Sequence, residues 1–142
     1  MISTTVIYQS RKGNTKKVAQ AIAEVTDAEL IDIHVPSVLP QTDLLFVGMG
    51  IYAGKPDQDL LDYLELLPVN EIRGAAVFST SCKGNDCMEL AINILEHKGI
   101  TVYPVHLALK GKFLFMNRKL QGVEELTRAK EFALQVQRSF NG

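Results

Sequence analysis

The segment from residue 5 to residue 25 constrains the fold more than any other part of the chain. A short apolar run, Thr5–Tyr8, leads into a polar turn, and apolar residues at helical spacing follow at once. The turn holds two hydroxyl-bearing residues, Ser10 and Thr15, and one glycine, Gly13. Backbone N–H groups and the positive end of a helix dipole converge at such a turn, so the segment predicts a phosphate-binding site.

The rest of the chain repeats this alternation of apolar runs and helical patterns. We expect strands over residues 4–8, 29–35, 44–48, 75–79 and 101–107, and helices over residues 14–25, 57–67 and 123–140. A further helix is expected between Asp86 and Gly99, with Asp86 and Glu89 forming a capping box. Five β-α units without a hairpin signal predict an α/β fold, a parallel sheet with helices on both faces.

No linker or repeat interrupts this pattern, so we expect one domain spanning residues 1–142. Ligands of such sheets bind at the carboxyl ends of the strands. The loops after the first, third and fourth strands carry the unusual chemistry here, and we expect them to meet at one site.

Composition and charge narrow the functional classes. The net charge of −1 argues against a nucleic-acid partner, and no run of about twenty apolar residues is present to cross a membrane. The chain starts without a basic segment, so a secretory signal is not expected. Cys82 and Cys87 match neither zinc-binding nor C-x-x-C spacing, and two thiols without a signal favour a reducing cytoplasm. The three histidines lack metal-binding spacing, and no metal site is expected.

Three kinds of phosphate site compete for the first turn. A P-loop needs G-x-x-x-x-G-K-[ST], but Gly13 is followed by Asn14, which disfavours an NTPase. A dinucleotide site needs G-x-G-x-x-G, and the turn has one glycine, although Asp32 could bind a ribose. The third is a cradle for one phosphate, built from Ser10, Asn14, Thr15 and the N–H groups of the turn. An ordinary helix cap by Ser10 or Asn14 is the structural alternative.

The turn resembles the phosphate loop of flavodoxins, whose pattern is roughly [ST]-x-[ST]-G-x-T. The chain keeps Ser10, Gly13, Asn14 and Thr15 and departs at Lys12, where flavodoxins usually carry a hydroxyl. The resemblance assigns the phosphate to the whole turn, that is, to Ser10, Arg11, Lys12, Gly13, Asn14 and Thr15.

Chain length and two later segments, residues 109–113 and 125–133, extend the resemblance to the whole chain. It implies a flavodoxin-like, three-layer, doubly wound sheet of five parallel strands in the order 2-1-3-4-5. It also implies a bound flavin mononucleotide (FMN) and one-electron transfer.

The resemblance places the flavin ring between the two later loops. The loop after the third strand contributes Gly50, Ile51, Tyr52, Ala53 and Gly54. Flavodoxins often carry an aromatic side chain there that packs on the ring, a role carried over to Tyr52 or Ile51, since a flavin needs flat apolar walls. The alternative for Tyr52 is a surface residue that anchors its loop.

The loop after the fourth strand is expected to wrap the pyrimidine edge of the flavin. It contributes Ser81, Cys82, Lys83, Gly84 and Asn85. Flavodoxins commonly place a tyrosine late in this loop, and this chain has none, which implies a more open flavin face, weaker FMN binding, or an aromatic supplied by residues 113–116. Core packing or a dimer contact is the alternative for that segment. Cys82 could touch the flavin or be an inert loop residue.

The leading hypothesis is an electron carrier rather than an independent enzyme, exchanging electrons with a reductase and an acceptor enzyme. An FMN-dependent quinone or small-molecule oxidoreductase is the alternative, and a binding module without flavin is a third. A phosphoacceptor domain would need acids after the first strand, where Tyr8-Gln9-Ser10 has none. We expect a monomer or a weak dimer.

Charged residues add two expectations. Asp57, Asp59, Asp62 and Glu65 are predicted to form an acidic rim beside the flavin for a basic partner. Lys83 is predicted to stabilise the reduced flavin anion and so raise its potential.

Overall fold

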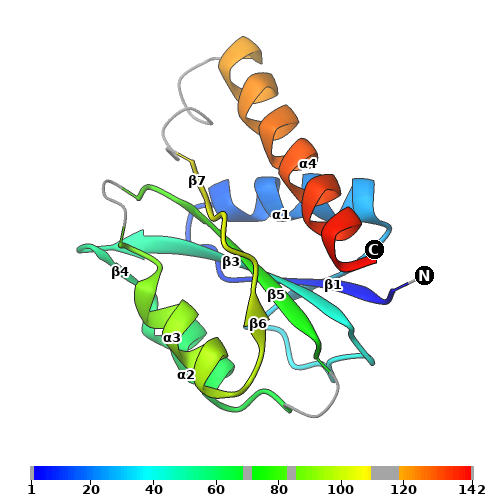
Figure 1. Ribbon diagram of the computed structural model, residues 1–142. Helices are drawn as coiled ribbons and strands as arrows, with labels where there is room; N and C mark the ends of the chain where they lie inside the picture. Colours follow the sequence, from blue (N-terminus) through cyan, green and yellow to red (C-terminus); the bar gives the residue numbers. More distant parts are fainter. Residues whose placement is uncertain (1, 69–71, 83–85, 110–118, 142) are drawn as a thin grey trace.

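The computed structural model describes residues 2–68, 72–82, 86–109 and 119–141 (Figure 1). The first half of the chain forms β1 (Thr4–Tyr8), α1 (Asn14–Thr26), β2 (Glu29–Asp32), β3 (Leu44–Tyr52), β4 (Lys55–Pro56) and α2 (Gln58–Glu65). The second half forms β5 (Gly74–Thr80), α3 (Glu89–His97), β6 (Thr101–Val102), β7 (Leu107–Leu109) and α4 (Lys119–Asn141).

The strands form one sheet in the order β2-β1-β3-β5-β6, with β4 paired to β3 and β7 paired to β5. Strands β1, β3 and β5 run parallel at its centre, where Val6 pairs with Phe46 and Phe46 with Ala76. All residues of β1 and β5 are buried. This explains their continuous apolar runs, which are typical of parallel strands covered on both faces.

Helices cover both faces of the sheet, as predicted. Figure 1 shows α1 and α4 on one side and α2 and α3 on the other. One hydrophobic cluster joins α1 and α4 to the sheet through residues such as Val18, Phe46 and Ala133, and the other joins α2 and α3 through residues such as Leu60, Val47 and Leu95. The three-layer α/β fold is therefore confirmed.

The prediction of five strands without a hairpin is wrong. Strand β4 runs antiparallel to β3, with Tyr52 opposite Lys55. The two residues between them, Ala53 and Gly54, have φ angles of 52° and 79°, and two positive φ angles are the mark of a type I′ hairpin turn. Ala-Gly is not one of the common sequences of that turn, so the sequence did not reveal it.

The expected strand over residues 101–107 is divided in two. Thr101–Val102 pairs with the start of β5, and Leu107–Leu109 pairs with its end. Pro104 lies between the two pieces and has no N–H to donate to a ladder. The strands at the five predicted places lie side by side in the sequence expected from the resemblance, β2-β1-β3-β5-β6, but β4 and β7 are added, so a sheet of five strands only is not confirmed.

The helix starts differ in their capping. The expected capping box at α3 is wrong: Met88 is the N-cap residue, without a side-chain cap, and Asp86 accepts the N–H of Glu89 through its backbone oxygen (3.1 Å). Gly99 ends this helix with a φ of 84°, as predicted. Among the described residues, no helix has the length and apolar character needed to span a membrane.

Candidate functional site

A pocket of about 270 Å³ lies at the carboxyl edge of the sheet. It is lined by residues from the ends of β1, β3 and β5, the strands whose following loops were predicted to meet. These residues are Ser10, Arg11, Lys12, Asn14, Thr15, Gly50, Ile51, Tyr52, Thr80 and Ser81. The structure thus brings together most of the predicted residues from segments far apart in the sequence.

The turn after β1 ends in the unprotected start of α1. Gly13 is the N-cap residue, with a φ of 93°, and the helix has no side-chain cap. Ser10 does not cap the helix but closes the turn, since its Oγ accepts the N–H of Gly13 (3.0 Å). The first N–H groups of a helix have no partner within it, so the start of α1 presents unsatisfied donors beside the pocket. The alternative of an ordinary helix cap by Ser10 or Asn14 is therefore not what the structure shows.

Two buried residues follow Gly13 in the pocket wall. Asn14 is 9% exposed, and its Oδ1 has no hydrogen-bond partner among the described residues. Because an amide can present either its oxygen or its NH₂ group, this side chain can serve a ligand donor or acceptor. Thr15 Oγ1 lies 2.8 Å from Thr80 Oγ1, and both residues are about 2% exposed. In such a pair one hydroxyl donates to the other, and the second hydrogen remains available to a ligand.

Thr80 was missed by the sequence reasoning. The available signal was a hydroxyl residue at the carboxyl end of a strand that the pattern already placed next to the site. Gln9 was missed too: it is fully buried, and its Oε1 accepts the N–H of Gly50 (3.3 Å). It ties the turn after β1 to β3 without lining the pocket.

The Tyr52 ring forms an aromatic wall of the pocket and is held in place by the side chain of Arg11. The guanidinium carbon of Arg11 lies 3.6 Å from the centroid of the Tyr52 ring, a cation–π contact. The same guanidinium binds Asp57 Oδ2, at 2.7 Å from Nη2 and 3.0 Å from Nε. A Cβ on Gly50 would lie 2.5 Å from the Tyr52 hydroxyl, so the ring lies close over this glycine. Glycine at position 50 therefore allows Tyr52 to lie along the wall.

Asp57 is not part of an exposed rim, and that expectation is wrong for this residue. It is 7% exposed, binds Arg11, and caps α2 by accepting the N–H of Asp59 at Oδ1 (2.8 Å). Asp59, Asp62 and Glu65 are exposed on α2, as expected. Asp59 Oδ2 lies 3.1 Å from Nε2 of His34.

Several predicted residues do not line the pocket. Gly13 shapes the turn, and Ala53 and Gly54 form the β3–β4 hairpin. Lys83, Gly84, Asn85 and residues 113–116 lie outside the described residues, and the predictions made on them remain predictions.

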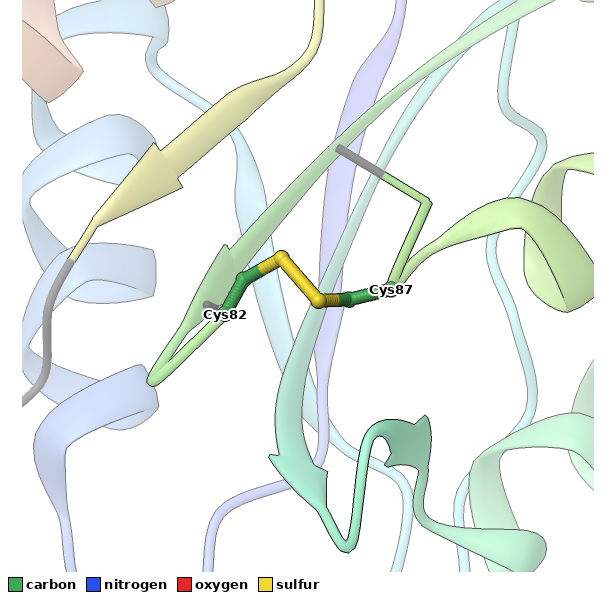
Figure 2. The surroundings of a disulfide bond; sticks show 2 residues. All are labelled: Cys82 and Cys87. Carbon is green, nitrogen blue, oxygen red and sulfur yellow. A yellow bond between two sulfur atoms is a disulfide. The ribbon is translucent and has the colours of Figure 1, made fainter. Parts of the chain in front are cut away.

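The expectation of two thiols is wrong: Cys82 and Cys87 form a disulfide (Figure 2). Their Cα atoms are 5.9 Å apart, within the range that a disulfide spans. Four intervening residues are not a recognisable redox spacing, so the sequence did not reveal the bond. Among the described residues, no group of three or more His, Cys, Asp or Glu side chains could hold a metal ion.

Comparison with known proteins agrees with this fold. A protein of Methanocaldococcus jannaschii, described as uncharacterized, is 27% identical over 146 aligned positions, which cover 92% of this chain and 95% of that protein. A flavodoxin from the domain Archaea has a similar structure, with a TM-score of 0.70 and 18% identity over 96% of this chain and 99% of that one.

A flavodoxin mutant of Fusobacterium nucleatum, solved bound to flavin mononucleotide, has a TM-score of 0.64 and 12% identity over 91% of this chain and 93% of that one. At these identities the structural matches show likeness of fold. The family model described as a flavodoxin domain matches residues 5–103, more than half of the sequence. This chain therefore belongs to the flavodoxin domain family.

Proposed function

We propose that this protein binds FMN in the pocket at the carboxyl edge of the sheet and carries electrons between a reductase and an acceptor enzyme. The observation that carries the proposal is the pocket itself, which joins an uncapped helix N-terminus to an aromatic wall. The first feature suits a phosphate and the second suits a flat ring. When bound, FMN supplies one-electron chemistry that amino-acid side chains lack.

The residues of the first turn fit a phosphate. The N–H groups at the start of α1 have no protein cap, and Asn14 and Thr15 are buried beside them. The Thr15–Thr80 pair can offer one further hydroxyl hydrogen. Lys12 is exposed and lines the pocket, so it adds positive charge at the mouth. Charge-assisted hydrogen bonds of this kind are the strong ones.

The opposite wall fits a ring. Ile51 is 7% exposed and packs in the core, while Tyr52 is half-buried and held by Arg11. In this arrangement Ile51 and Tyr52 would orient the flavin ring and exclude water from one of its faces. Because Asp57 offsets the charge of Arg11, the wall is rigid without bringing a full unpaired charge to the pocket.

The lining favours a carrier over the alternative, an FMN-dependent quinone or small-molecule oxidoreductase. Among the described residues that line the pocket there is no Asp, Glu, His or Cys, and of the other groups that transfer protons, Tyr52 is engaged by Arg11 and Lys12 is exposed. We further propose that a basic partner docks on the exposed acids of α2, which starts beside Arg11. A cytoplasmic location is part of the same proposal.

The phosphate seat is tested by comparing FMN with riboflavin, which lacks the phosphate. Thr15→Val removes a pocket hydroxyl and should weaken FMN binding by roughly tenfold, about 1.5 kcal/mol, while riboflavin binding changes little. Thr5→Val is the matched control, because Thr5 and Thr42 form a similar buried hydroxyl pair (2.8 Å) away from the pocket. Equal losses for both flavins would overturn the assignment of the phosphate to this turn.

A turnover assay distinguishes an electron carrier from an independent oxidoreductase. The purified FMN-loaded protein is mixed with NADH or NADPH and a quinone, with and without an added flavodoxin reductase. A carrier should show rapid electron flow only with the reductase. Rapid oxidation of the nicotinamide by the protein alone would favour the oxidoreductase.

A further inference from the structure

The disulfide lies directly beside the pocket wall. Cys82 follows Ser81, which lines the pocket, and Cys87 lies just before the start of α3. Figure 2 shows the bond between the end of β5 and the chain that leads into α3. Both cysteines are buried, and they belong to the same hydrophobic cluster as Ile51 of the opposite wall.

Consecutive residues connect the bond to the phosphate turn. Thr80 contacts Thr15, and Ser81 follows with a φ of 69°, a left-handed conformation that is unfavourable for a residue other than glycine. The N–H of Ser81 donates to the oxygen of Leu109 (2.8 Å). Ser81 is thus held between a hydrogen bond at its own N–H and the covalent link at the next residue. Breaking that link acts first on this wall of the pocket.

The spacing argues that the bond has a local effect. The cysteines are five positions apart, and a disulfide that closes a short ring restricts the unfolded chain less than one that closes a long ring. In a cytoplasmic protein a disulfide is typically transient and redox-sensing. A bond that stabilises the whole fold less than a long-range disulfide would, and that adjoins a ligand pocket, fits that class.

We propose that Cys82 and Cys87 form a second redox site, a dithiol–disulfide couple whose oxidation state sets the affinity of the pocket for FMN. The proposal rests on the FMN site proposed above. The disulfide form, in which Ser81 is held in its left-handed conformation, is the form with high affinity. The dithiol form releases one of the two constraints on Ser81 and binds FMN more weakly.

A dithiol is the class of reductant that converts one form into the other. Its thiolate attacks one sulfur of the pair, breaks the S–S bond and forms a mixed disulfide, which its second thiol resolves. The reductant leaves as a cyclic disulfide, and two electrons and two protons end on the thiols of Cys82 and Cys87. The reverse reaction with a disulfide oxidant restores the bond.

Thermodynamic linkage makes the proposal quantitative. If the disulfide form binds FMN tenfold more tightly, saturation with FMN must lower the reduction potential of the couple by about 30 mV, because the coupling is reciprocal. The two measurements use different readouts, flavin fluorescence and thiol content, and must agree.

The experiment uses the full chain equilibrated without oxygen in mixtures of dithiothreitol and its cyclic disulfide. The chain has two cysteines, so after an acid quench and removal of dithiothreitol a thiol reagent reports this pair alone, from zero to two thiols. We expect the disulfide form to bind FMN at least about tenfold more tightly, and the midpoint to fall by the amount that linkage requires. The variant C82A/C87A is the control, and its affinity should not respond to dithiothreitol.

Three results would overturn the proposal. Affinities within twofold for the two forms, with a midpoint that FMN does not move, would reject the coupling and leave the FMN site intact. Failure of both forms to bind FMN would reject the proposed function and the coupling together. Two thiols that the cyclic disulfide cannot oxidise would reject the redox couple itself.

Discussion

Helices α1 and α2 both begin at the carboxyl edge of the sheet, and their N-termini differ in how they are capped. At α2, Asp57 accepts the N–H of Asp59 and also binds Arg11, so the helix carries its own anion. At α1, the N-cap residue is Gly13, which has no side chain, and no side-chain cap is formed. The same physical need is met by a side chain of the protein at α2, whereas at α1 no side chain meets it.

This difference distinguishes α1 from α2 as the proposed phosphate site, which the presence of a helix N-terminus alone does not do. Every helix has unsatisfied N–H groups at its start, but α2 offers no room for an external anion because a buried carboxylate already occupies that place. Arg11 connects the two ends. It leaves the turn before α1 to pair with Asp57, so its charge supports the internal anion rather than the open end, where Lys12 remains exposed.

The largest effect on FMN affinity is expected from a substitution that places a carboxylate at the start of α1, as Asp57 does at α2. Gly13→Asp places a carboxylate at the open end, where a Cβ would meet no atom within 4 Å. FMN affinity should fall roughly hundredfold, about 3 kcal/mol, because the carboxylate competes for the N–H donors and repels the phosphate. Riboflavin affinity should change much less, and flavin fluorescence titrations measure both.

Gly13→Asn is the matched control for this change. It carries the same backbone strain at a φ of 93° and a side chain of the same shape, without the charge. Equal FMN affinities for the Asp and Asn variants would mean that no anion binds at the start of α1.

Removing the Asp57 carboxylate at the start of α2 should instead lower the stability of the fold. Asp57→Ala deletes a helix cap and the partner of Arg11, and the free energy of unfolding should fall by about 2 kcal/mol. Asp57→Asn retains capping ability and should lose about half as much. Urea denaturation measures both. Equal losses for the two variants would assign the whole effect to the ion pair and none to the cap.

The contrast between the two helices also marks how far sequence reasoning could go. The turn after β1 is local: strand, glycine, hydroxyl residues and helix follow one another within the stretch from Thr4 to Thr26, so this arrangement could be predicted. The buried strands β3 and β5 were readable for the same reason, because continuous apolar runs report burial on both faces.

The partners of Asp57 could not be predicted from the sequence. Arg11 lies 46 positions away, and nothing local distinguishes a buried, paired Asp57 from the exposed Asp59 two residues later. The Thr15–Thr80 pair spans 65 positions, and the disulfide has a spacing without a known signature. Such contacts depend on how the strands are ordered and how far each extends, which a local pattern does not specify.

A smaller effect is expected at the exposed acids of α2. Asp62→Asn with Glu65→Gln should slow electron transfer to a basic haem protein by roughly threefold to tenfold at low salt, because complementary charges accelerate encounter. The difference should vanish at high salt. Glu24, which is exposed on α1 at the other face of the sheet, supplies the control: Glu24→Gln should leave the rate unchanged. A rate independent of salt for the native protein would contradict docking on α2.

The smallest effects are expected when the pH is lowered. Acid should change the stability of the fold and, through a different group, the affinity for FMN at the start of α1. Burial lowers the pKa of His106 from its usual 6.5, and Glu96 opposes the shift. The unfolded chain therefore takes up a proton first as the pH falls through about 6.5, so stability is highest above that pH and declines below it. His106→Gln should flatten this decline between about pH 7.5 and about pH 5.5.

The FMN phosphate loses its second charge near pH 6, in the same range, so FMN affinity should fall with acid in both the native protein and His106→Gln. Riboflavin affinity should not follow it, since riboflavin has no phosphate to protonate. Denaturation and flavin titrations across this range distinguish the two effects. An acid-dependent loss of FMN affinity that disappears in His106→Gln would move its cause from the phosphate at α1 to the histidine between β6 and β7.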